Sequence, residues 1–174
     1  MPGEKIFGVN EVLTAADMTT YFVQQAVVVK TADESVTSST TMQNDNELLV
    51  PVAANTRYWV ECFLIYSAHP NFDCKTGYSG PSGSTFDWCG DGLISSVTTT
   101  VGEVTRSLQG LGSTPGHAGV LESGSPIDMV AMHKGVLTTG ESAGTLTLRW
   151  AQLSSGATPT IVRAGSVLIV TRVS

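Results

Sequence analysis

Short strand-like segments recur along the whole sequence, and this regularity limits the fold more than any other feature. The segments are apolar and β-branched, and Gly, Pro, Asn, Asp and Ser separate them. We count about eight such segments at roughly 10-residue spacing, which is the pattern of a β-sandwich or jelly roll. We therefore predict a mainly β fold, an antiparallel, jelly-roll-like β-sandwich with one short N-terminal helix.

The clearest strand is 56–67, TRYWVECFLIYS, and it is apolar on both faces. One face carries Tyr58, Val60, Cys62, Leu64 and Tyr66, and the other carries Trp59, Phe63 and Ile65. A strand of this kind lies in the middle of a sheet with cover on both sides. The sandwich core supplies one cover, and either the N-terminal helix or a neighbouring subunit supplies the other. We predict that Trp59, Phe63 and Ile65 lie in a subunit interface or under the helix.

The predicted helix covers residues 14–25 and has a recognisable start. Thr14 is the expected N-cap, and Asp17 completes an imperfect capping box in which Asp replaces the usual Glu or Gln. Leu13 and Met18 occupy the two positions of a hydrophobic staple, which fixes the angle at which the chain enters a helix.

The same helix is expected to bury one face. Met18, Tyr21, Phe22 and Gln25 follow an i, i+3, i+4, i+7 spacing, so three large side chains point the same way. A helix this short is marginal in water unless that face is buried. The helix either packs on its own domain or docks on another protein through Leu13, Met18, Tyr21, Phe22 and Gln25. We divide the chain into an attachment segment, 1–30, and a sandwich head, 31–174.

Charge and hydropathy exclude several classes of partner. Charged residues make up only 14% of the 174 residues and the net charge is −6, against about 25% charged residues in a typical domain. Without a cluster of Lys and Arg, the chain is not expected to bind nucleic acid or an anionic membrane. No apolar run is long enough to span a bilayer, and the opening MPGEKIFG does not resemble a signal peptide.

The three cysteines indicate a reduced protein. Cys62, Cys74 and Cys89 form no CxxC pair, and their number is odd. Production in a reducing cytoplasm predicts three free thiols. The alternative is a single bridge between Cys74 and Cys89, which flank a loop.

Catalytic and metal-binding motifs are missing from the sequence. It contains no GxSxG, HExxH, GxGxxG or Walker pattern. His69, His117 and His133 are far apart in the sequence, and a metal site made by His69, Asp73 and Cys74 would lack a second paired motif. We predict a protein that is not an enzyme and holds no cofactor or metal.

Aromatic side chains leave glycan binding open as an alternative. Tyrosine and tryptophan stack on sugars when they are exposed, although their placement in strands favours core or subunit packing. The Gly-rich loop 109–124 is a second candidate for recognition. The aromatic candidates are Tyr58, Trp59, Tyr66, Tyr78, Trp88 and Trp150.

Four stretches of the sequence resemble one known group of proteins. The opening GVNEVLTAADMTTYFVQQAVVV is similar to the N-terminal module of virion proteins from phages of actinobacteria, especially Streptomyces. The stretches VPVAANTRYWVECFLIYSA, GTLTLRWAQ and VRAGSVLIVTRV resemble their β-sandwich heads. Thr19 departs from the Asn that is usual there, and residues 108–134 fall outside the resemblance.

The resemblance implies a phage structural protein made in the bacterial host cytoplasm and carried on the virion. Its helix would anchor on other virion proteins of the capsid or tail, and its sandwich would project, commonly as a trimer. The alternative is a receptor-binding module whose head recognises a host cell-wall polysaccharide.

Overall fold

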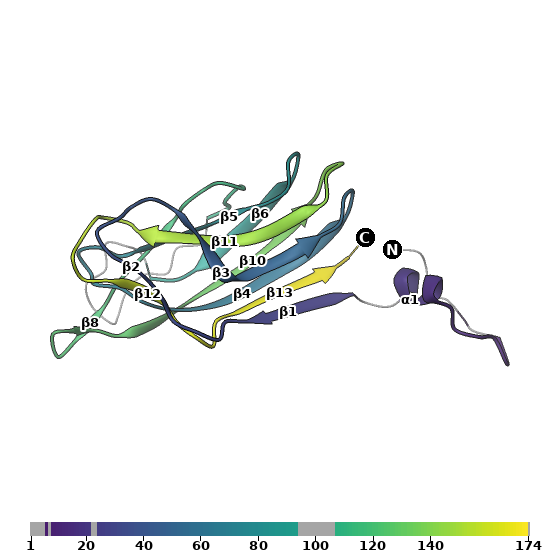
Figure 1. The fold of residues 1–174 in the computed structure, drawn as a ribbon, viewed down its shortest axis with the longest axis horizontal. Helices are drawn as coiled ribbons and strands as arrows, with labels where there is room; N and C mark the ends of the chain where they lie inside the picture. The colour runs from purple at the N-terminus through teal and green to yellow at the C-terminus, as the bar shows by residue number, and fades with distance from the viewer. Residues whose placement is uncertain (1–5, 7, 22–23, 94–106, 174) are drawn as a thin grey trace.

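The computed structural model describes residues 6, 8–21, 24–93 and 107–173, which form one helix, α1 (Ala15–Tyr21), and two main antiparallel sheets (Figure 1). Sheet A contains β1 (Gln25–Val29), β2 (Glu34–Val36), β4 (Arg57–Ser67), β6 (Thr85–Asp91), β10 (Asp128–Thr138), β12 (Thr160–Val162) and β13 (Val167–Arg172). Sheet B contains β3 (Gln43–Val52), β5 (Cys74–Ser79), β7 (Gly116–His117) and β11 (Gly144–Gln152). A small hairpin, β8 (Leu121–Glu122) and β9 (Ser125–Pro126), completes the described strands.

The order of the strands is that of a jelly roll. In sheet A the order β1-β13-β4-β10 pairs the first strand with the last, and sheet B has the order β3-β11-β5-β7. The chain changes sheet between β3 and β4, between β4 and β5, and between β10 and β11, as expected for two interleaved Greek keys. The predicted mainly β sandwich with one short helix is confirmed.

The core fills the space between the two sheets. β4 alternates as predicted, with Tyr58, Val60, Cys62, Leu64 and Tyr66 all buried. Pro51 lies in β3, which is an edge strand of sheet B, where a residue without an N–H leaves no partner unsatisfied. The largest apolar and aromatic side chains that are fully buried are Trp88, Trp150, Tyr66, Tyr78, Phe86, Leu48, Leu64, Leu137, Leu146, Leu148 and Leu168.

The helix begins as predicted but is shorter than the predicted 14–25. The backbone N–H of Asp17 donates to Thr14 Oγ1 at 3.1 Å, and Thr14 N–H donates back to Asp17 Oδ2 at 2.9 Å, so the capping box forms. The helix ends at Tyr21, and Gln25 begins β1. The run AVVV is β-branched, and pairing along the whole of β13 stabilises it as a strand.

This pairing also changes the predicted division of the chain. Residues 25–29 form the first strand of sheet A, so this part of the predicted 1–30 attachment segment belongs to the sandwich. α1 lies beyond the end of the sandwich, near the C-terminal end of β13, and covers neither sheet (Figure 1). No helix among the described residues is long and apolar enough to cross a membrane.

The predicted loop 109–124 is partly structured. Its residues 116–117 form β7, which pairs with Lys75 and Cys74 of β5 as the fourth strand of sheet B. Glycines in this stretch hid the strand, because they remove the alternating pattern on which a sequence-based prediction depends.

A thiol titration checks the state of the cysteines. All three are free in the structure; Cys62 and Cys74 are buried, and Cys89 is half-buried. Burial raises the pKa of both Cys62 and Cys74 to about 12, so neither forms the reactive thiolate near neutral pH. We expect one thiol per chain to react quickly in the native protein and three after denaturation. Only one reactive thiol in denaturant would contradict this expectation and indicate a bridge.

Candidate interaction surface

The outer face of sheet A, which points away from the core, is apolar, and no other part of the described chain covers it. Trp59 and Phe63 of β4 are 39% and 41% exposed, and Ile65 is half-buried. Neighbouring strands add exposed apolar side chains on the same side. We call this surface the apolar face, and it consists of Val27, Val29, Trp59, Phe63, Ile65, Val130, Met132, Val136, Val167 and Ile169.

Strand register makes the apolar face continuous. Phe63 lies opposite Val167 of β13 on one side and Met132 of β10 on the other, and Val167 lies opposite Val29 of β1. These four side chains form one row across four strands, at the spacing at which cross-strand neighbours touch. Parallel rows place Val136 beside Trp59 and Val130 beside Ile65. A continuous patch of exposed apolar side chains is a feature of interaction surfaces.

One ion pair interrupts the apolar face. Glu61 of β4 lies opposite Lys134 of β10, and the carboxylate and ammonium groups are 3.5 Å apart. Both side chains are partly exposed, so the pair adds little to stability. Its consequence is that the face carries no net charge at its centre.

The outer face of sheet B has a different character. β11 turns Thr145, Thr147 and Arg149 outward, because Leu146, Leu148 and Trp150 fill the core. Residues near Ser113 also lie over this sheet, where a Cβ at Gly77 would come within 2.5 Å of Ser113 O. Only the outer face of sheet A therefore combines an apolar surface with the absence of a cover among the described residues.

The structure brings together the predicted interface residues but only part of the predicted docking set. Trp59, Phe63 and Ile65 share the apolar face, as the alternation of β4 requires. Leu13 and Met18 are both nearly half exposed at the start of α1.

The other three residues of the predicted docking set are Tyr21, Phe22 and Gln25. Tyr21 is the last residue of the helix, Phe22 lies outside the described residues, and Gln25 is an exposed residue of β1. Gln25 therefore does not share a helical face with Met18, which corrects that part of the predicted set.

Most of the aromatic side chains considered for sugar stacking lie in the core. Trp88, Trp150, Tyr66 and Tyr78 are at most 1% exposed. The exposed member of the set is Trp59, within the apolar face.

A buried polar cluster that the sequence did not predict links two histidines. His117 of β7 and His133 of β10 stack with their Nε2 atoms 3.4 Å apart. Thr76 Oγ1 lies 2.9 Å from His117 Nε2, and Tyr78 OH lies 2.9 Å from His133 Nδ1. Burial lowers the pKa of His117 to about 4, and burial with the neighbouring imidazole lowers the pKa of His133.

Part of this cluster was visible in the sequence. His133 alternates with the buried residues Ala131, Gly135 and Leu137, which places it on the inner face of β10. No sequence signal predicts the path that brings His117 to it. Among the described residues, no group of three or more His, Cys, Asp or Glu side chains is arranged to hold a metal ion.

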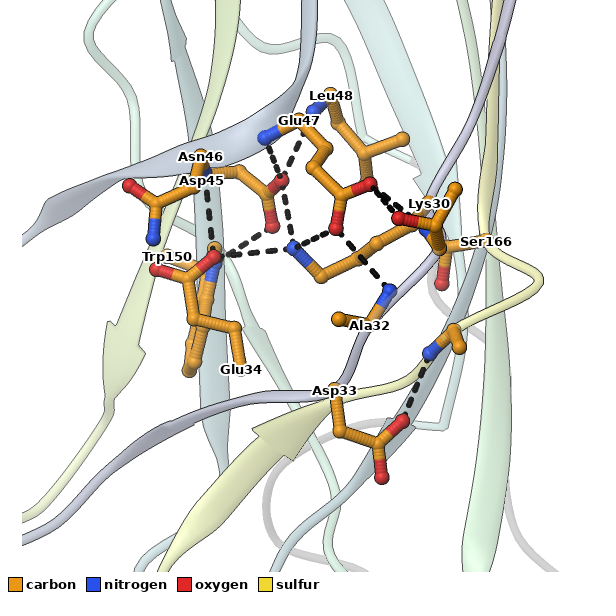
Figure 2. Close-up of polar contacts among 12 residues, drawn as sticks. Lys30, Ala32, Asp33, Glu34, Asp45, Asn46, Glu47, Leu48, Trp150 and Ser166 are labelled. Carbon is orange, nitrogen blue, oxygen red and sulfur yellow. Dashed lines mark hydrogen bonds and ion pairs between the residues drawn. The ribbon is translucent and has the colours of Figure 1, made fainter.

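A second buried polar cluster surrounds Lys30, directly after β1 (Figure 2). Its ammonium group donates to Asp45 Oδ1 at 2.9 Å and to Glu34 Oε2 at 3.0 Å. Asp45 also accepts from Trp150 Nε1 at 3.1 Å and from the backbone N–H of Leu48 at 2.8 Å. Burial lowers the pKa of Lys30, but the bonds and charges of the two carboxylates outweigh it, so the pKa is raised. Every group has a partner, so the cluster joins strands and offers no free ligand site.

Comparison with known proteins gives only distant likenesses. No protein-family model and no curated protein matches the chain. A solved structure of the tripod from the baseplate of bacteriophage Tuc2009 is similar at 15% identity and a TM-score of 0.34, over 99% of this chain and 79% of that one. A structure of the Gx strain of infectious bursal disease virus is similar at 9% identity and a TM-score of 0.21, over 98% of this chain and 45% of that one. Likenesses this distant carry no conclusion about the partners or the activity of the chain.

Proposed function

We propose that this protein is a non-enzymatic structural protein of a phage particle, attached to the capsid or tail by its N-terminal segment and projecting a trimeric β-sandwich head. The observation that supports it best is the uncovered apolar face of sheet A. The sequence resemblance to actinobacterial phage virion proteins supplies the setting, with synthesis in the host cytoplasm and a final place on the virion.

The apolar face is suited to binding two further copies of the same chain. At a three-fold axis each residue meets its own copies, so apolar side chains are favoured there and like charges are excluded. Trp59, Phe63 and Ile65 on the central strand meet this condition. Glu61 meets it as well, because Lys134 neutralises it within the same chain.

The N-terminal segment is the proposed anchor. Ile6, Val9 and Val12 are strongly exposed, as are Leu13 and Met18 to a lesser degree. α1 lies beyond the end of the sandwich (Figure 1), and the exposure of these five side chains shows that the domain itself does not bury them. Contact with another virion protein would remove this apolar surface from water.

Host-glycan recognition has less support as the main role. The aromatic side chains that would stack on a sugar are mostly in the core, and Trp59 belongs to the proposed interface. A glycan array with the purified protein separates this alternative from the structural role.

Removal of the anchor tests the attachment. We expect a protein that begins at Gln24 to fold with an unchanged melting temperature, because it keeps all of β1, and to be absent from particles assembled in an infected host. In the full chain, the double change Tyr21→Ala, Phe22→Ala should also lower incorporation, since each aromatic contributes about 2–3 kcal/mol when buried. The change Thr19→Ala, Thr20→Ala in the same helix is the control. Normal decoration of particles by the shortened protein would refute the anchor.

A further inference from the structure

Residues 107–127, which we call the strap, run from β6 of sheet A to β7 at the edge of sheet B and on to the β8–β9 hairpin. At the first end Gln109 and Trp88 exchange backbone hydrogen bonds of 2.7 and 3.1 Å, and the Trp88 indole donates to Gly110 O at 3.2 Å. β7 follows and adds to sheet B. Figure 1 shows the next part, around β8, at the end of the sandwich far from both chain termini.

The middle of the strap is held to three other elements. Tyr66 OH of β4 donates to Ala118 O at 2.8 Å, and Gly119 N–H donates to Asp73 Oδ1 at 2.8 Å. Ala118 N–H donates to Leu93 O at 2.9 Å. The buried residues in the middle of the strap are Ala118, Gly119 and Val120, which are small, and one larger residue.

The larger residue is His117, the one buried titratable side chain of the strap. Its stacking partner His133 belongs to the central strand β10, so the histidine pair joins the strap to the sandwich. The bonds suit two neutral rings, in which Thr76 donates to His117 Nε2 and Tyr78 donates to His133 Nδ1. This assignment of protons follows from the network, since the donors and acceptors depend on the tautomers.

Within the described part of the chain, neither imidazole of the pair is bonded to a carboxylate that would stabilise a positive charge. The titratable groups around it are Tyr78 and Cys74 of β5, Tyr66 and Cys62 of β4, Cys89 and Asp91 of β6, and Asp73 before β5. Among the described residues, no carboxylate makes a hydrogen bond or ion pair with either imidazole. A proton on one ring is therefore a poorly compensated buried charge, and protons on both place two cations 3.4 Å apart.

Water would reach both rings once the strap leaves. Gly90 and Gly92 border the pair, and a Cβ at these positions would lie 3.0 Å from His133 Cδ2 and 2.7 Å from His117 Nδ1. The rings are thus covered on that side by backbone without side chains. The core leucines Leu64, Leu148 and Leu168 come from β4, β11 and β13, none of which belongs to the strap.

We propose that the strap is an acid-released closure of the sandwich: protonation of His117 and His133 detaches residues 107–127 while the two main sheets stay folded. This inference does not depend on the proposed virion function.

The direction of the pH effect follows from the number of protons that the open and closed forms of the strap bind. Both histidines have a pKa below the ordinary 6.5 when the strap is closed, so the open form binds more protons. The closed form is fully favoured above about pH 6.5 and loses its advantage as the pH falls from there. For His117, with a pKa of about 4, the open population rises at most about 300-fold.

Asp73 acts in the opposite direction. Burial raises its pKa from 3.8 to about 6, so this group increasingly favours the closed form as the pH falls below about 6, and the effect is complete below about 3.8. In acid the two histidines favour the open form and the single carboxyl favours the closed form, so the strap opens on balance. At pH 4.5 we expect about 100-fold more opening than at pH 7.5.

Hydrogen exchange followed by mass spectrometry on the full chain tests the proposal. After correction for the intrinsic rates, amides in 107–127 should lose about 100-fold of their protection between pH 7.5 and pH 4.5, while those of β4, β11 and β13 keep theirs. Unchanged protection of the strap, or loss of protection in all strands together, would overturn the proposal.

Variants separate the role of the histidines from a general weakening. His117→Gln should reduce the acid response at least tenfold, and Asp73→Asn should increase it about tenfold by removing the opposing group. An acid response in His117→Gln equal to that of the wild type refutes the mechanism.

Opening without acid gives an independent reading. A Cβ at Gly119 would lie 2.3 Å from Ala68 O, so Gly119→Ala should open the strap at pH 7.5. Gly110→Ala in the same strap, where the nearest atom is 4.0 Å away, should leave it closed. If Gly119→Ala stays closed at pH 7.5, the strap does not detach as a unit and the proposal fails.

Discussion

Replacing Lys30 by alanine is expected to lower the free energy of unfolding by about 3 kcal/mol. Removing one partner of a buried ion pair usually costs about 3–5 kcal/mol, because the other charge stays buried without compensation. The Asp45 side chain is fully buried. We expect a cost at the lower end of this range, because Asp45 keeps other N–H donors, such as Trp150 Nε1. Thermal unfolding should show a fall in melting temperature of roughly 6–12 °C for a domain of this size.

The matched control is a solvent-exposed ion pair of the same protein. Lys134→Ala removes the ammonium group that pairs with Glu61, but both side chains are about 40–50% exposed. Exposed pairs of this kind contribute about 0–1 kcal/mol. Equal destabilisation by the two substitutions would show that burial of the Lys30 cluster is not what makes it stabilising.

The double change Trp59→Asp, Phe63→Asp is expected to convert the proposed trimer into a folded monomer. Trp59 and Phe63 are 39% and 41% exposed in the single chain, so burying the rest of each contributes about 1 kcal/mol, and the loss of both weakens association by about 30-fold. Carboxylates at a three-fold axis add repulsion between copies. The core is untouched, because both side chains lie on the outer face, so the variant should keep its circular dichroism spectrum.

Sedimentation of the wild type and the variant at micromolar concentration measures this effect. Leu49→Asp is the control, since Leu49 is 37% exposed on β3 of the other sheet. The wild type should sediment as a trimer, the control likewise, and the double variant as a species of about one chain mass. A monomeric wild type, or a double variant that remains trimeric, would refute the proposed interface.

Local patterns predicted the strands well where side chains alternate. The segment 56–67 became β4, with the predicted faces, because burial on one side of a pleated strand leaves a period of two in the sequence. Capping of the helix by Thr14 and Asp17 was equally readable, since both bonds span three residues. The end of the same helix was not, because residues 25–29 pair with β13, about 140 positions further along the chain.

Long-range contacts also explain the two buried polar clusters. Nothing near Lys30 in the sequence shows that Asp45 and Trp150 will enclose it. His117 and His133 are brought together by the strap, whose glycines carry no periodic signal. The apolar outer face of β4, by contrast, was predicted from the sequence because an apolar second face is a property of one strand.

The sequence by itself determined the mainly β class, the position of β4 with its two apolar faces, and the start of the helix, because these depend on neighbours within a few residues. Only the tertiary structure decided where the helix stops, which residues extend the apolar face beyond β4, and how the histidine and lysine clusters form. These depend on the order and register of strands distant in the sequence, which place side chains together without leaving a trace in local spacing.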